Sequence, residues 1–168
     1  MMRQVRFSED WISPLDQRRS FALIASALAD STGSQIWPRE YSESRLEGAG
    51  HTPAGAPLGR GSLLEVTYKL GPIHRKVVYR VVEVIEPRYI QYETTDLHPL
   101  AGGGRIYFRA LYGGKSLCKW EGGYRVRDRI GYAALAWFKA YYERQFFRAI
   151  KERFEALTPE AGGESRSA

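Results

Sequence analysis

Cysteine and histidine, the usual protein ligands of zinc, are rare in this sequence. The chain of 168 residues contains one cysteine, Cys118, and three histidines, His51, His74 and His98. A single cysteine excludes an intramolecular disulfide, and the histidines stand too far apart in the sequence to show the ligand spacing of a zinc site. We therefore expect neither a metal centre nor a bound cofactor.

Aromatic side chains are the unusual feature of the composition. The chain has eleven Tyr, seven Phe and four Trp. Tyrosine and tryptophan join a large apolar body to one polar atom, which suits either a packed core or a pocket that holds a ligand through a few hydrogen bonds. The number of aromatic residues does not separate these roles, so the elements that carry them must be identified.

The net charge of +6 does not by itself predict a nucleic-acid partner. Near the C-terminus Arg148 and Lys151 alternate with Glu152 and Glu155, which is typical of a solvated helix face rather than of a basic stripe. The sequence lacks the roughly 18 consecutive apolar residues of a membrane span, and its start lacks the apolar segment of a secretory signal. We expect a cytoplasmic protein that neither binds nucleic acid nor inserts stably into a membrane.

Alternation of apolar and polar residues predicts seven strands. One lies near the start, a weaker one covers residues 39–46, and five follow between residues 64 and 127, separated by short turns and by a glycine-rich loop at 97–104. Ser13-Pro14 predicts a helix that Ser13 caps. From Ile130 to Leu157 an apolar stripe with helical spacing predicts one long helix.

Hairpin register predicts which side chains share the inner face of the sheet, because orientation alternates strictly along a strand. An even loop after Leu70 and another at Glu86-Pro87 place Tyr68, Tyr79 and Tyr92 on one face, together with a carboxylate, Glu83. In the last hairpin a three-residue loop pairs Phe108 with Trp120 and turns both inward, whereas a two-residue turn would mix apolar and charged side chains.

The order of these elements resembles that of the START-like superfamily, also called Bet v 1-like or SRPBCC. The resemblance runs from about residue 3 to residue 157 and rests on Ser13-Pro14, Trp37 before the second strand, the Glu86-Pro87 turn and the aromatic last helix. It implies an α+β helix-grip fold, in which a curved antiparallel seven-stranded sheet wraps around a long C-terminal helix, with one or two short helices near the N-terminus. Residues 1–158 would form this domain, and 159–168 would be a disordered tail.

By resemblance, such proteins hold lipids, sterols, polyketides, hormones or aromatic compounds between the sheet and the last helix, and some are aromatase/cyclases or dehydratases. We therefore expect this chain to bind, or transport, a hydrophobic small molecule such as a lipid or a polyketide-like aromatic. The residues expected to line its cavity are Tyr68, Tyr79, Tyr92, Phe108, Trp120, Phe138 and Tyr142.

Three alternatives remain open. The same aromatic residues could fill a core that holds no ligand. The chain could be a cyclase or dehydratase in which Glu83 is the general base and a tyrosine donates a hydrogen bond to the developing enolate. The apolar first half of the last helix, with Trp137 and Tyr141, could instead form a homodimer surface.

Overall fold

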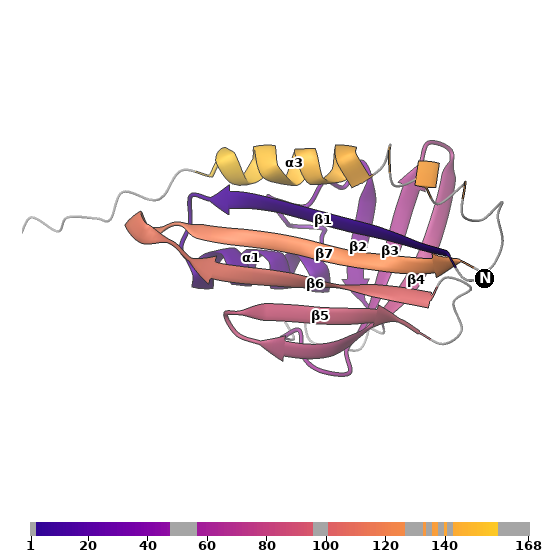
Figure 1. Ribbon diagram of the computed structural model, residues 1–168, viewed down its shortest axis with the longest axis horizontal. Coiled ribbons are helices and arrows are strands. Elements are labelled where there is room, and N and C mark those ends of the chain that lie inside the picture. Colours follow the sequence, from indigo (N-terminus) through magenta and orange to yellow (C-terminus); the bar gives the residue numbers. More distant parts are fainter. Residues whose placement is uncertain are drawn as a thin grey trace, which may run out of the picture.

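The computed structural model describes residues 3–47, 57–95, 101–126 and 143–157, and the single positions 133, 136, 137 and 140. Its main element is an antiparallel sheet of seven strands in the order β1-β7-β6-β5-β4-β3-β2 (Figure 1). The strands are β1 (Arg3–Ser13), β2 (Ser42–Leu46), β3 (Leu63–Leu70), β4 (Ile73–Ile85), β5 (Tyr89–Thr94), β6 (Ala101–Ala110) and β7 (Ser116–Val126). This sheet confirms the predicted fold class.

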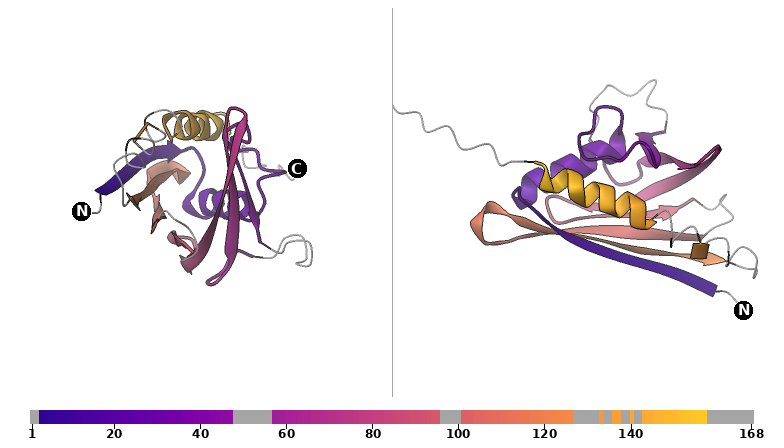
Figure 2. Two further views of the ribbon diagram at one scale, coloured as in Figure 1. Left: turned by 90° about the vertical axis from the view of Figure 1, so that its right-hand side faces the viewer. Right: turned by 90° about the horizontal axis from the view of Figure 1, so that it is seen from above.

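Two helices lie on the concave side of the sheet. The sheet curls so that β1 stands opposite β3 and β4, and α3 (Arg144–Glu155) lies across the open side (Figure 2). The other helix, α1 (Gln17–Ala29), packs against β2, β6 and β7. The core between these layers is apolar, because side chains alternate along each strand: in β5, Ile90 and Tyr92 are buried and Glu93 is exposed.

Ion pairs and one backbone contact hold α3 in place. Lys151 Nζ lies 2.8 Å from a carboxylate oxygen of Glu9 on β1. On the other side, Arg153 donates to the carbonyl oxygen of Trp37 and pairs with Glu40 at 2.7 Å. The helix is thus tied to the first strand and to the segment before β2, and its buried face meets the sheet between them.

The start of α1 differs from the prediction. The cap is Asp16, whose Oδ1 accepts a hydrogen bond from the Arg19 N–H at 2.9 Å, and Ser13 is instead the last residue of β1. The hydroxyl of Ser13 has other partners, because it forms a buried group with Ser20 and Ser116 in which neighbouring oxygens are 2.8 Å apart. These three serines fasten α1 to the ends of β1 and β7.

Five glycines lie where β6 and β7 run side by side. Gly102, Gly103 and Gly104 belong to β6, so the predicted loop at 97–104 is wrong for residues 101–104, while residues 96–100 lie outside the described part of the chain. Gly103 and Gly104 pair with Gly123 and Gly122. A Cβ at Gly122 would stand 2.4 Å from the Gly103 carbonyl oxygen, so the strands need glycine to approach this closely.

The last hairpin has the predicted faces but a different register. Phe108 is opposite Cys118 and Ile106 is opposite Trp120, because the turn between β6 and β7 contains a short helical segment, η1 (Tyr112–Gly114). The shift is two residues, an even number, and therefore keeps Phe108 and Trp120 buried on the inner side.

The C-terminal helix α3 is shorter than the helix predicted from the sequence. Of the long helix predicted from Ile130 to Leu157, α3 covers Arg144–Glu155, and most positions from 127 to 142 lie outside the described residues. The predicted tail at 159–168 lies outside them as well. In the described part of the chain, no helix has both the length and the hydropathy needed to cross a membrane.

Candidate functional site

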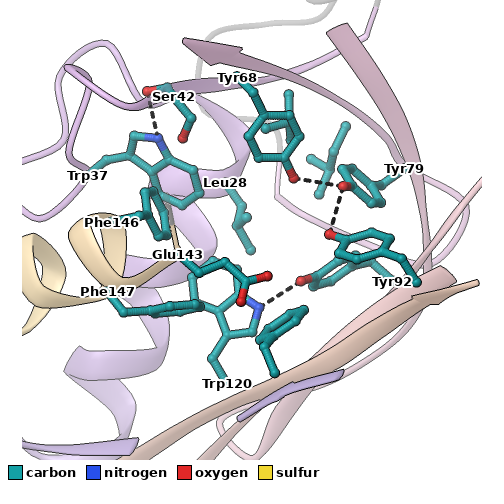
Figure 3. A pocket seen from close by; sticks show the side chains of 14 residues that line it. Leu28, Trp37, Ser42, Tyr68, Tyr79, Tyr92, Trp120, Glu143, Phe146 and Phe147 are labelled. Atoms are coloured by element: carbon teal, nitrogen blue, oxygen red, sulfur yellow. Dashed lines mark hydrogen bonds between the residues drawn. The ribbon is translucent and has the colours of Figure 1, made fainter. Parts of the chain in front are cut away.

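A cavity of about 60 Å³ lies between the inner face of the sheet and the start of α3 (Figure 3). Most of its wall is apolar, since α1, α3, β1, β3 and β7 all contribute hydrophobic or aromatic side chains. The lining residues are Phe7, Leu28, Trp37, Ser42, Leu64, Val66, Tyr68, Tyr79, Tyr92, Trp120, Tyr124, Glu143, Phe146 and Phe147.

Three tyrosine hydroxyls form a hydrogen-bonded chain in the wall. The Tyr79 hydroxyl lies 2.7 Å from that of Tyr68 (Figure 3). It lies 3.0 Å from the hydroxyl of Tyr124. These residues come from β3, β4 and β7, so the chain closes only when the curled sheet brings its two halves together. The polar atoms of three separate strands thereby converge in one region of an apolar cavity.

Trp120 and Gly104 position a fourth tyrosine, Tyr92. The Trp120 Nε1–H donates to the Tyr92 hydroxyl at 2.7 Å, and the Tyr92 ring packs edge to face on Tyr79 with centroids 5.2 Å apart. A Cβ at Gly104 would stand 2.4 Å from the Tyr92 hydroxyl. Glycine at position 104 therefore gives this hydroxyl its room.

Three of these hydroxyls remain neutral well beyond physiological pH. Burial is the largest cause that raises the pKa of Tyr79, Tyr92 and Tyr124 well above the ordinary value, and neighbouring tyrosines add to the shift. A neutral phenol can donate a hydrogen bond as well as accept one. The cavity therefore offers neutral donors to an oxygen or nitrogen atom.

Glu143 adds a carboxylate to this wall. It precedes α3, and its side chain extends into the cavity toward Trp120 and Tyr92 (Figure 3). Its charge is among the smaller causes that raise the pKa of Tyr92 and Tyr124. The carboxylate thus acts electrostatically on two of the four tyrosines.

Ser42 supplies one more polar atom, at a different place in the wall. The residue is 1% exposed, and its Oγ has no hydrogen-bond partner among the described residues. Figure 3 places it next to Trp37, away from Tyr79 and Tyr92. The polar lining therefore consists of a group of tyrosines with Glu143 and, apart from it, a single hydroxyl.

The structure brings four of the seven predicted ligand-binding residues together: Tyr68, Tyr79, Tyr92 and Trp120 all line the cavity. Phe108 is buried but packs on Phe21 of α1, with ring centroids 5.4 Å apart, and is not among the lining residues. Phe138 and Tyr142 lie outside the described residues.

The predicted orientation of Glu83 is wrong. A β-bulge between Val81 and Glu83 shifts the pairing of β4 with β5, so that Val84 lies opposite the buried Ile90 and Glu83 is exposed on the outer face. There the Tyr89 hydroxyl donates to the Glu83 carboxylate. Glu83 therefore lies outside the cavity and cannot act as a base in it.

Several lining residues were not among the predicted site residues. Tyr124 could have been selected, since the strand pattern already turns it inward. Phe146 follows from the apolar stripe of the last helix, but helical spacing does not distinguish a residue in contact with a cavity from one in the core. Ser42 and Glu143 show no signal in the sequence, because nothing distinguishes either residue from the other polar residues of its segment.

The described residues offer no evident metal site, since no three of their His, Cys, Asp and Glu side chains stand close enough together to hold an ion. In the helix half expected to form a homodimer surface, the structure describes Ala133, Ala136, Trp137 and Ala140, of which Trp137 is 62% exposed, and dimerisation stays a prediction. Tyr141 lies outside the described residues.

Comparisons with known proteins find similarity in structure only. No protein-family model matches the sequence, and no curated protein is similar to it in sequence. Among solved structures, the Zhui aromatase/cyclase from a Streptomyces species has a TM-score of 0.68 at 13% identity, with 97% of this chain and 99% of that chain covered.

Two further structures are similar over most of their length. Norcoclaurine synthase from Thalictrum flavum, in complex with dopamine and hydroxybenzaldehyde, has a TM-score of 0.63 at 11% identity and covers 94% of this chain and 91% of its own. A START superfamily protein from Mycobacterium smegmatis has a TM-score of 0.61 at 14% identity and covers 89% and 97%. At these identities the similarity concerns the fold, and this chain has the helix-grip fold of the START-like, Bet v 1-like superfamily.

Proposed function

We propose that the protein binds a small, mainly apolar molecule that carries an oxygen-bearing group, and that the group docks against the tyrosine hydroxyls. The observation that supports this most is the convergence of four tyrosines on one apolar cavity. Small-molecule sites typically combine an apolar wall with a few well-placed polar groups. Neutral tyrosine hydroxyls that line a space can hydrogen-bond a ligand as well as one another.

The size of the cavity limits the ligand. A volume of about 60 Å³ is well below the roughly 150 Å³ of an engineered cavity that binds benzene. A single aromatic ring therefore enters only if part of the wall moves outward. Norcoclaurine synthase, which has the same fold, is known in complex with one-ring aromatic molecules, and this supports one-ring compounds as the first class to test.

The test is thermal stabilisation by a panel of one-ring phenols and aromatic aldehydes, measured with the purified protein. A ligand at a hundred times its dissociation constant stabilises the folded state by about 2.7 kcal/mol, or several degrees in the melting temperature. Native mass spectrometry would then give the stoichiometry, for which we expect one molecule per chain.

A matched pair of variants locates the binding. Val66→Phe adds a ring to the cavity wall, whereas Val78→Phe adds the same ring on the outer side of the sheet, where position 78 is only half-buried. We expect Val66→Phe to abolish the ligand-induced stabilisation and Val78→Phe to keep it. Absence of stabilisation of the wild-type protein across the panel, or equal stabilisation of both variants, would contradict the proposal.

The position of Glu143 favours a second candidate, an enzyme of cyclase or dehydratase type. A carboxylate in an apolar cavity can remove a proton from the carbon next to a carbonyl group, and a neutral tyrosine can donate a hydrogen bond to the enolate oxygen that forms. Glu143 would then have the role that the sequence suggested for Glu83.

Two variants distinguish these carboxylates. If turnover of linear β-diketones is found, Glu143→Gln should abolish it, and Glu83→Gln, on the outer face, should leave it unchanged. Turnover that survives Glu143→Gln would remove this residue from the mechanism. Absence of turnover, with binding of one-ring ligands intact, would leave binding as the function.

A further inference from the structure

Ser42 is buried in a way that costs stability. Its side chain lines the cavity, is 1% exposed and has no hydrogen-bond partner among the described residues. A buried hydroxyl that has given up water without gaining a partner is unfavourable compared with an alanine at the same position. Its presence here therefore calls for a partner that the described residues do not supply.

The next inward-facing residue of the same strand shows the contrast. Ser44 is also buried, at 2% exposed, but its Oγ donates to the Leu28 carbonyl oxygen at 2.7 Å, and its N–H donates to Ser31 Oγ at 3.0 Å. A hydroxyl on this strand can thus be satisfied by the protein. Ser44 is not among the cavity-lining residues, whereas Ser42 is.

The backbone at Ser42 is fixed, so its hydroxyl stays in the cavity wall. The Ser42 carbonyl oxygen accepts from the Trp37 Nε1–H at 3.1 Å, and the Ser42 N–H donates to the Pro38 carbonyl oxygen at 3.2 Å. On the neighbouring strand β3, the residue opposite Ser42 is Tyr68. Tyr68 extends away from Ser42, and its hydroxyl reaches Tyr79 (Figure 3).

We infer that Ser42 is a ligand-binding residue and that the ligand carries two oxygen-bearing groups, one at each end of an apolar body. One group contacts the tyrosines and the other accepts from, or donates to, the Ser42 hydroxyl. This inference rests on the proposed binding function and makes it more specific, because it selects bifunctional one-ring compounds over those with a single polar group.

The first test needs no ligand. Without ligand, Ser42→Ala should unfold at the same temperature as the wild type or at a higher one, because it removes an unpaired buried hydroxyl. Ser44→Ala is the matched control and should lower the melting temperature by roughly 3–6 °C, because it leaves the Leu28 carbonyl oxygen unpaired. A similar loss in both variants would overturn the inference, since Ser42 would then have a structural partner such as a bound water molecule.

The second test uses two probes that differ by one hydroxyl, para-ethylphenol and para-(hydroxyethyl)phenol. Wild type should bind the second probe about threefold to tenfold more tightly, the gain of one hydrogen bond. Ser42→Ala should lose this preference and retain its affinity for para-ethylphenol. Equal binding of both probes by wild type overturns the inference alone, whereas binding of neither contradicts the proposed function as well.

Discussion

Tyr79→Phe tests whether the tyrosine chain holds the two halves of the curled sheet together. The substitution keeps the ring, which is 3% exposed and packs on Tyr92, and removes only the hydroxyl that links Tyr68 to Tyr124. Two hydrogen bonds, of 2.7 and 3.0 Å, are lost. At about 0.5–1.5 kcal/mol each, the free energy of unfolding should fall by about 1–3 kcal/mol.

Urea denaturation followed by tryptophan fluorescence measures this loss. The midpoint should shift to lower urea concentration while the slope of the transition stays unchanged, because the surface exposed on unfolding is the same. For a chain of this length the melting temperature falls by roughly 2–4 °C for each kcal/mol.

The control is Tyr112→Phe, at a fully exposed position in the turn between β6 and β7, which should have no effect. If Tyr79→Phe had the same midpoint as Tyr112→Phe, the hydroxyl chain would contribute no stability. The argument that these tyrosines form one connected group would then fail.

Three further predictions concern alkaline pH, the single thiol and the glycines. Because the pKa values of Tyr79, Tyr92 and Tyr124 are raised in the folded state, the unfolded chain releases these protons first. The free energy of unfolding should therefore decrease as pH rises above about 10. In an absorbance titration, part of the tyrosine signal should appear only on unfolding. Reversible ionisation of all eleven tyrosines in the folded protein would contradict this. Burial raises the pKa of Cys118 to about 12, so a thiol-specific disulfide reagent should react only in denaturant, and rapid labelling of the folded protein would show that the thiol is accessible. Gly122→Ala should destabilise the folded protein by about 1–3 kcal/mol, because the new methyl group would meet backbone atoms. Gly33→Ala, with no atom within 4 Å of its Cβ, should not. Equal melting temperatures of the two variants would refute the close approach of β6 and β7.

The buried face of most strands could be predicted even where the pairing partner of a residue could not, because the two are determined separately. Alternation sets the face, and any even error in register leaves the face unchanged. The pairing of Phe108 was thus wrong by two residues, yet its burial was predicted correctly. An odd change reverses the face, and this is what the bulge in β4 does to Glu83.

The sequence of β4 gives a weak indication of the bulge, because it has apolar residues on both faces, but alternation alone does not show where the bulge lies. Val78, Val82 and Val84 are apolar on the side opposite Tyr79 and Val81, so either phase of the strand could be buried. The structure uses both, the first up to Val81 and the second from Val84. The residue at which the buried face changes depends on how β4 pairs with β5, and the sequence of β4 alone does not indicate this pairing.

The cavity itself was less predictable than the sheet. Tyr68, Tyr79, Tyr92 and Trp120 follow from strand faces, but the role of Ser42 depends on the absence of a partner. A missing hydrogen bond is a property of the folded surroundings, and no spacing pattern encodes it.

The glycines where β6 and β7 meet leave the wall of the cavity thin. Phe7 and Tyr92 line the cavity and also border a groove of about 770 Å³ on the other side of the sheet, where Arg6, Arg105 and Arg125 are exposed. Only one layer of backbone separates the cavity from this charged outer surface, which Glu93 and Glu121 also line. A Cβ placed at any of these five glycines would stand within 3.0 Å of a backbone oxygen, so a side chain added there would displace the strands that carry Phe7 and Tyr92.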